Sequence, residues 1–186
     1  MIYNVRGPSG AGKSWVARQV LDRFGMQEEM YGADQRTIEG YILGSPLPCF
    51  LVGSYAAPTG GADALHGDWD QIAEILRQWR LWPVILEGIR INSGHTNMID
   101  LVKKEKMDLE VIFLSTPEEV CFQNVMARRE SARTTRKVDQ VRYWIRDHIQ
   151  RNERQKKHFR EAGISSRIVS SEEAVTYLTS VLGGQP

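Results

Sequence analysis

Cysteine is scarce in this chain: of its 186 residues only Cys49 and Cys121 are cysteines, and they lie far apart. They form no Cys-x-x-Cys pair, which argues against a zinc site and is typical of proteins in a reducing cytoplasm. No apolar run approaches the roughly 18 residues of a membrane-spanning helix. Residues 1–5 show no basic segment followed by a long apolar one, so we expect no signal peptide. These absences predict a globular cytoplasmic protein without a membrane partner.

Net charge is nearly absent too, because the formal charge at pH 7 is only +1. The basic residues are nevertheless concentrated. Residues 128–160 hold 12 Lys and Arg against 4 Asp and Glu, a net charge of +8, which leaves −7 for the rest of the chain. A basic segment on an acidic body favours a polyanionic partner at one face. A solvated helical surface is the alternative that composition leaves open.

The order of apolar segments indicates an α/β fold in a single domain, residues 1–186. Short apolar runs that are typical of buried strands alternate with amphipathic helices. We expect strands at 2–6, 84–86, 109–114 and 166–170, and helices at 14–24, 68–79, 96–106, 117–129, 137–160 and 172–182. Residues 37–43 and 49–55 flank a Gly-Ser-Pro-Leu-Pro turn and predict a β-hairpin. Strands that alternate with helices predict a mostly parallel sheet with helices on both faces.

The most specific motif is residues 7–14, Gly-Pro-Ser-Gly-Ala-Gly-Lys-Ser, which match G-x-x-x-x-G-K-[ST] at every fixed position. A predicted strand precedes the motif and a predicted helix follows it. The glycines allow successive backbone N–H groups to point inward and form an anion site with the helix N-terminus. Lys13 is expected to reach the β- and γ-phosphates of ATP, and the Ser14 hydroxyl to bind Mg²⁺. The predicted nucleotide-binding residues are Gly7, Pro8, Ser9, Gly10, Ala11, Gly12, Lys13 and Ser14.

With this loop, the chain resembles the P-loop kinases of nucleotides and small molecules, which include adenylate, shikimate and gluconate kinases. The resemblance covers most of the chain. It implies a three-layer sandwich with a mostly parallel sheet of about five strands, helices on both faces, and a lid that closes over ATP and excludes water. To this core the chain would add a β-hairpin and substrate-side loop at residues 36–66 and a basic helical lid at residues 128–160. The Asn-Lys-x-Asp motif of GTPases does not occur.

Residues 114–136 resemble the segment that leads into the lid of these kinases. A buried strand is followed by Pro-Glu-Glu at the start of a helix and then by arginines. The planar guanidinium of arginine binds phosphate oxygens through paired hydrogen bonds. The resemblance implies that Arg129 and Arg133 neutralise charge on the transferring phosphoryl group and that Arg128 binds ATP.

Three acidic residues are candidates for the chemistry, and the sequence does not decide which is the general base. Glu87 ends an apolar strand, where ligands bind in open α/β sheets. Its segment, Glu-Gly-Ile-Arg, resembles the Asp-Gly-x-Pro-Arg of nucleoside monophosphate kinases but lacks the proline. We expect Glu87 to hold a Mg²⁺-bound water or to act as the base. Asp34 and Asp63 would accept the proton of the acceptor hydroxyl, and turn formation is the alternative for both.

The hairpin, the Gly-Gly-Ala-Asp loop and the Glu-Gly-Ile-Arg segment resemble small phage kinases that phosphorylate the hydroxymethyl group of 5-hydroxymethyluracil in DNA. This resemblance implies an ATP- and Mg²⁺-dependent enzyme whose partner is DNA in the host cytoplasm. A DNA acceptor requires phosphate contacts, for which the helix at 137–160 offers Arg146 and Lys156. Two alternatives remain, a kinase of a nucleotide or small hydroxylated metabolite, and an ATP-binding regulatory module without phosphate transfer.

Apolar residues in the basic helix repeat at helical spacing and are expected to face the body of the protein. They are Val138, Val141, Ile145 and Ile149. Trp79, Trp82 and Trp144 are expected in the core rather than on a nucleobase.

Overall fold

The computed structural model describes residues 1–32, 34–44, 47–56, 60–65, 69–88, 94–132 and 138–183, except for the side chains of residues 130–132. Its strands are β1 (Ile2–Arg6), β2 (Met26–Tyr31), β3 (Ile38–Leu43), β4 (Cys49–Val52), β5 (Val84–Glu87), β6 (Leu109–Leu114) and β7 (Ser165–Val169). The helices are α1 (Lys13–Phe24), the 3₁₀ turn η1 (Ala62–Ala64), α2 (Trp69–Gln78), α4 (His95–Glu105), α5 (Glu118–Ala132), α6 (Val138–Glu161) and α7 (Ser171–Val181). No helix in these ranges is long and apolar enough to cross a membrane.

The strands form one sheet in the order β2-β3-β4-β5-β1-β6-β7. The five adjacent strands β4-β5-β1-β6-β7 are parallel, and β3 runs antiparallel to both of its neighbours. The predicted α/β class and the parallel core are therefore confirmed. The sheet has seven strands rather than about five, because β3 pairs with the outer edge of β4, and β2 in turn pairs with β3.

The edge strand β2 is absent from the sequence prediction. Residues 26–31 read Met-Gln-Glu-Glu-Met-Tyr, without a regular apolar alternation, and most of their side chains are exposed or half-buried. The strand exists because β3 supplies a backbone partner along its length, from Met26 opposite Leu43 to Tyr31 opposite Ile38. Acidic side chains on an exposed edge also discourage pairing with another chain.

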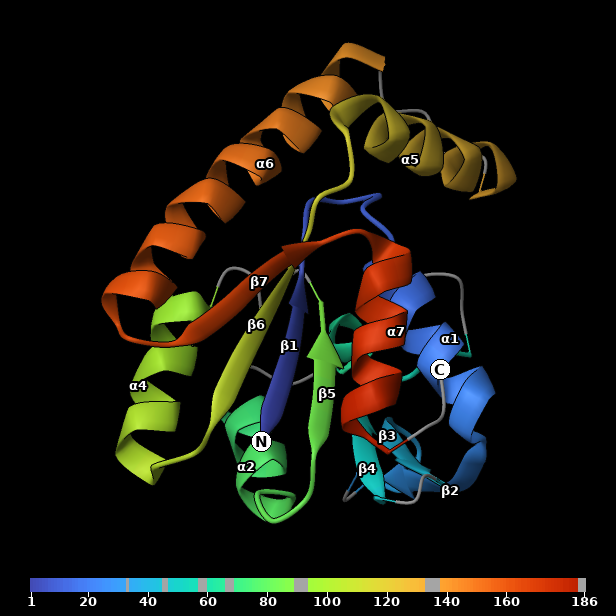
Figure 1. Ribbon diagram of the computed structural model, residues 1–186. Coiled ribbons are helices and arrows are strands. Elements are labelled where there is room, and N and C mark those ends of the chain that lie inside the picture. Colours follow the sequence, from blue (N-terminus) through green and yellow to red (C-terminus); the bar gives the residue numbers. More distant parts are fainter. Residues whose placement is uncertain are drawn as a thin grey trace.

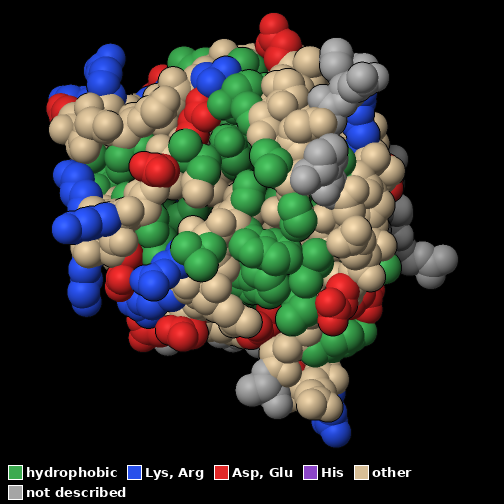
Figure 2. All heavy atoms as spheres, turned by 60° about the horizontal axis from the view of Figure 1, so that its bottom comes forward, with side chains coloured by type: hydrophobic (Ala, Val, Ile, Leu, Met, Phe, Trp, Pro, Cys, Tyr) green, Lys and Arg blue, Asp and Glu red, His purple; other side chains and the backbone are tan. Residues whose placement is uncertain are grey.

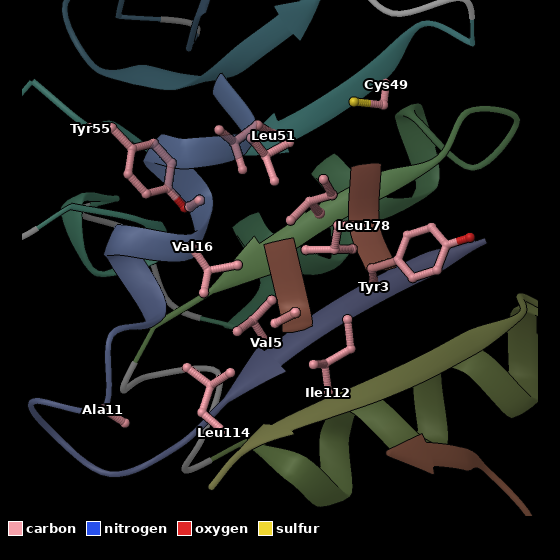
Figure 3. Close-up of a cluster of buried hydrophobic side chains, with 14 of the residues drawn as sticks. Tyr3, Val5, Ala11, Val16, Cys49, Leu51, Tyr55, Ile112, Leu114 and Leu178 are labelled. Carbon is pink, nitrogen blue, oxygen red and sulfur yellow. The ribbon is translucent and has the colours of Figure 1, made fainter. Parts of the chain in front are cut away.

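Helices cover both faces of the sheet. Tyr3 and Val5 of β1 point to the face covered by α1 and α7, and Figure 3 shows this cluster with Ala11 of the 7–14 loop at its edge. Ile2 points to the opposite face, where α2 and α4 pack. The alternation follows from the period-2 geometry of a strand buried on both sides.

Helices α5 and α6 lie across the carboxyl ends of the strands, above the sheet in Figure 1. The predicted buried face of α6 is confirmed for Val141 and Ile145, which are buried, whereas Val138 at the first turn is 48% exposed. Two ion pairs join the helices: Arg142 Nη1 is 2.8 Å from Glu119 Oε2, and Arg146 Nε is 2.7 Å from Glu118 Oε1. Helix α5 continues to Ala132, beyond the predicted end at Arg129.

The opposite end of the molecule carries hydrophobic side chains. Figure 2 shows them gathered on the face where the strands begin, and the most exposed is Leu81, at 89%. Nearby, Trp79 stacks on Phe50 with ring centroids 4.3 Å apart, and Trp82 contacts the edge of Trp79. The prediction that Trp79 packs against the core is therefore confirmed.

Candidate active site

The loop of residues 7–14 is held in place from its outer side. The Asn124 amide donates to the Gly10 carbonyl at 2.9 Å. The hydroxyls of Thr116 and Ser171 both donate to the Ala11 carbonyl, at 2.8 and 3.2 Å. Because α5, α7 and the segment after β6 hold these outward carbonyls, the opposite, N–H-lined side of the loop is left for an anion.

Close packing makes Gly10 indispensable to this arrangement. Its φ is +84°, a conformation that side chains disfavour. A Cβ atom at residue 10 would also overlap the carbonyl oxygen of Cys121 in α5. Glycine therefore lets the loop lie directly against α5.

Lys13 starts α1 and is buried with its ammonium on the inner side of the loop. Nζ donates to the carbonyls of Gly7 and Pro8, each at 3.0 Å. Burial lowers the pKa of Lys13, and the negative charges of Glu87 and Asp63 act in the opposite direction. The structure thus brings Lys13 together with two of the three predicted acidic residues.

Glu87 ends β5 beside the loop and is only 2% exposed. The Ser14 hydroxyl donates to its Oε1 at 2.9 Å. Burial raises the pKa of Glu87, although the charge of Lys13 and the Ser14 hydrogen bond oppose this shift. Gly61 lies against the carboxylate so closely that a Cβ atom there would overlap Oε1. The Gly-Gly pair before Asp63 therefore allows the 60–65 segment to approach Glu87.

Asp63 and Asp34 have different surroundings. Asp63 is half-buried in η1, and its carboxylate lies beside Gly88, next to Glu87. Asp34 is exposed in the turn between β2 and β3, three strands from β5. Its carboxylate accepts hydrogen bonds from its own turn, from the Arg36 and Thr37 N–H groups at 2.9 Å each and from the Thr37 hydroxyl at 2.6 Å. These bonds lower the pKa of Asp34 to about 2. The turn-forming alternative describes Asp34, and it takes no part in the cluster.

Among the predicted arginines that the structure describes, Arg128 lies close enough to Lys13 for its charge to lower the pKa of that lysine. Its Nε donates to the Asn124 carbonyl one turn earlier in α5. Burial lowers the pKa of Arg128, while the carboxylate of Glu87 raises it. Arg129 is half-buried, and its Nη1 is enclosed with no hydrogen-bond partner among the described residues. Arg133 lies outside the described residues.

Three further residues belong to this cluster and were not predicted. Arg18, one turn after Ser14 in α1, places positive charge near Glu87. The buried Tyr55 side chain lies near Glu87, and burial, followed by the Glu87 charge, raises the pKa of Tyr55 well above the ordinary value. His148 of α6 lies close enough to Lys13 for that charge to act on it. Only Arg18 carried a sequence signal, its position one helical turn from the motif.

The cluster has the oxygen ligands that Mg²⁺ takes in phosphate-transfer sites. Mg²⁺ is usually bound by one or two protein oxygens together with substrate phosphates and waters. The Ser14 hydroxyl and the Glu87 carboxylate, in direct contact beside the anion loop, fit this donor set. Within the described part of the chain, no group of three or more His, Cys, Asp or Glu forms a self-contained metal site.

Two phage proteins are similar in sequence to this chain. A "5-hmdU DNA kinase" of Pseudomonas phage PaMx11 is 33% identical over 133 residues, which are 69% of each chain. A "5-hmdU DNA kinase" of Bacillus phage SP10 is 28% identical over 176 residues, and the chain spans only 26% of its length. No known family profile matches.

Solved structures of deoxyadenosine kinase from M. mycoides also align with almost the whole chain. The one with bound dCMP has a TM-score of 0.48 at 11% identity over 98% of both chains. The one with dATP has a TM-score of 0.46 at 12% identity. Likeness at this level carries no conclusion about the site.

Proposed function

Because the chain belongs to the family of 5-hmdU DNA kinases, we propose that it transfers the γ-phosphate of ATP to the hydroxymethyl group of 5-hydroxymethyluracil in DNA. The observation that carries the proposal is the contact between Ser14 of the phosphate-binding loop and the buried Glu87 carboxylate at 2.9 Å. It joins an anion site to an acidic group at the carboxyl edge of a parallel sheet. The proposal places the reaction in the cytoplasm of the phage host.

Each residue of the candidate site has a separate role in an in-line phosphate transfer. The loop N–H groups and the Lys13 ammonium bind the β- and γ-phosphates, and Arg128 adds positive charge from the side of α5. Ser14 and Glu87 would hold Mg²⁺, Glu87 through a water. When bound, Mg²⁺ neutralises negative charge on the phosphate oxygens. Asp63, the second carboxylate beside Lys13, accepts the proton of the acceptor hydroxyl.

The direct test follows labelled phosphate. The protein is incubated with γ-labelled ATP and Mg²⁺ and with single-stranded oligonucleotides that differ only in one base, hydroxymethyluracil or thymine. A parallel series contains the free hydroxymethyl nucleoside, its monophosphate and a panel of common nucleotides. Label on the hydroxymethyluracil oligonucleotide alone supports the proposal. Label on a free nucleotide alone contradicts it and favours a nucleotide kinase, and ATP binding without acceptor-dependent ADP favours a regulatory module.

Substitution of Arg128 in α5 is expected to show whether this arginine acts in the transition state or in ground-state binding of ATP. Arg128→Ala should lower kcat and kcat/KM together by about a hundredfold, because a cation beside the transferring phosphate acts mainly in the transition state. Arg129→Ala is the matched neighbour and should have the smaller effect, since Arg128 lies close enough to Glu87 and Lys13 for their charges to interact. Steady-state kinetics with ATP varied would check this. A rise in the KM for ATP alone would make Arg128 a ground-state binding residue.

The salt dependence of DNA binding tests the basic helix. Arg146 and Lys156, expected from the sequence to contact phosphates, are each paired with a glutamate, Glu118 and Glu153. Arg154 and Arg160 are exposed on α6, and no carboxylate in the described part of the chain forms an ion pair with them. Their positive charge is therefore fully available to DNA.

We expect Arg154→Ala with Arg160→Ala to weaken binding to all DNA sequences. The log–log salt slope should become shallower by about 0.7 for each phosphate of a single strand that the variant no longer binds. The matched control removes two paired arginines of the same helix, Arg142 and Arg146, and should change the slope less. Fluorescence anisotropy at several salt concentrations measures both. Equal changes in the two double variants would contradict this assignment.

A further inference from the structure

Two aromatic side chains of α6 form a surface that neither hydrophobic core uses. The Trp144 and His148 rings lie one turn apart with centroids 4.5 Å from each other at an angle of 57°. Trp144 is half-buried, yet it packs against neither of the two clusters of buried residues. The sequence expectation of a core tryptophan at this position is therefore wrong. Its neighbour Ile145 occupies the core position instead.

The position of α6 brings His148, the second ring of this pair, close to Lys13. About two turns after His148, the Gln155 side chain accepts a hydrogen bond of 2.9 Å from Arg6, which directly precedes the phosphate-binding loop. This buried contact fixes α6 across the end of β1, and Figure 1 shows the helix crossing above the sheet. Burial lowers the pKa of His148 to about 4, and the next largest cause is the charge of Lys13. His148 therefore stands near Lys13 as a neutral imidazole.

The end of the phosphate chain near Lys13 is the acceptor's end. Lys13 reaches the β- and γ-phosphates, and the adenosine of ATP lies at the other end, beyond the α-phosphate. In hydroxymethyluracil a single methylene separates the reacting hydroxyl from the pyrimidine ring. The ring itself must therefore lie beside the transferring phosphate, near Lys13, Glu87 and His148 of α6.

We propose that the Trp144–His148 pair is the stacking surface for the acceptor pyrimidine, which enters the site unpaired and out of its base stack. This inference rests on the proposed function. Enzymes that react at a base within DNA take that base out of the duplex or act on single strands, and they hold it by stacking on aromatic side chains. A neutral imidazole provides one hydrogen-bond donor and one acceptor for a base edge and adds no charge next to the phosphates.

The test replaces Trp144 and compares the two substrates. Trp144→Leu keeps an apolar side chain but removes the ring, and Trp144→Phe restores a stacking face. Tyr143→Leu is the matched control, because Tyr143 is the preceding residue and is 76% exposed. Initial rates are measured with a single-stranded oligonucleotide that contains one hydroxymethyluracil, first with the oligonucleotide varied and then with ATP varied. We expect Trp144→Leu to raise the KM for the oligonucleotide by about 5- to 150-fold, with the KM for ATP unchanged.

The controls are expected to separate stacking from general damage. Trp144→Phe should recover most of the affinity, and Tyr143→Leu should match the wild type. A second measurement needs no catalysis: the hydroxymethyluracil oligonucleotide should quench tryptophan fluorescence of the wild type more than that of Trp144→Phe, which retains the other four tryptophans. Equal quenching in the two proteins would overturn the inference, even if Trp144→Leu does not fold.

Two further outcomes distinguish failure of the stacking surface from failure of the proposed function on which it rests. An unchanged KM for the oligonucleotide in Trp144→Leu, or a rise in the KM for ATP alone, overturns the stacking surface and leaves the proposed kinase activity standing. If the wild-type protein transfers no label to hydroxymethyluracil in DNA, the proposed function fails, and the inference fails with it.

Discussion

Lys13→Ala is expected to lower kcat by about a thousandfold or more, to the limit of detection. Lys13 is the cation on the inner side of the phosphate-binding loop, where its Nζ contacts the Gly7 and Pro8 carbonyls. Its charge acts on phosphate oxygens in a buried site, in which electrostatic interactions are strong. Replacement should leave the fold intact, because burial of the ammonium is unfavourable and lowers the pKa of Lys13.

The measurement is a single-turnover assay of phosphate transfer together with thermal unfolding. Lys103→Ala is the matched control, since Lys103 is an exposed lysine on α4. It should retain wild-type activity. A folded Lys13→Ala protein with undiminished transfer would remove the kinase assignment of the loop.

Glu87→Gln is expected to have the second-largest effect, a fall in kcat of about a hundredfold to ten-thousandfold. Glutamine preserves the shape of the side chain and an acceptor oxygen for the Ser14 hydroxyl, but it removes the negative charge. If Glu87 holds Mg²⁺ through a water, the Mg²⁺ concentration required for half-maximal activity should rise in this variant. Asp63→Asn is the comparison: it should lower kcat with little change in the Mg²⁺ requirement.

The same substitution is expected to stabilise the protein at neutral pH. Burial raises the pKa of Glu87 above its ordinary value. The folded protein therefore binds the proton more tightly than the unfolded chain, and the free energy of unfolding falls as the pH rises from the unfolded pKa through the folded one. Glutamine carries no such cost. Urea unfolding should show Glu87→Gln to be more stable than the wild type at pH 7, with the difference lost below about pH 4. Equal stability at pH 7 would contradict an unfavourable buried carboxylate.

The local parts of the site were predictable from the sequence. The loop spacing predicted residues 7–14 and the end of an apolar strand predicted Glu87, because both signals depend on neighbouring residues, and the structure places Ser14 against Glu87. The glycine pair identified Asp63 because close approach needs small residues, and Gly61 indeed lies against Glu87. Asp34 offered the same residue type in a polar loop, but its carboxylate is engaged by Thr37 and Arg36 in its own turn.

The long-range parts were not predictable. Tyr55 and His148 come from separate elements, and no spacing along the chain relates either of them to Lys13. Strand β2 was not predicted for a related reason, because its six residues depend on the backbone of β3 rather than on a buried face of their own. Trp144 has the apolar character of a core residue, and only its orientation on α6 distinguishes it from Ile145.

The central place of β1 has a consequence for how the molecule folds. This strand pairs with β5 and β6, which lie far along the sequence from it, so that Ile2 lies opposite both Val84 and Leu109. Closing such long loops is entropically costly, and folds with many distant contacts form slowly. The phosphate-binding loop is synthesised before α5, β6 and α7, and residues in or directly after these elements hold its carbonyls. During synthesis, a nascent chain that ends before β6 therefore lacks the contacts that hold this loop in the finished protein.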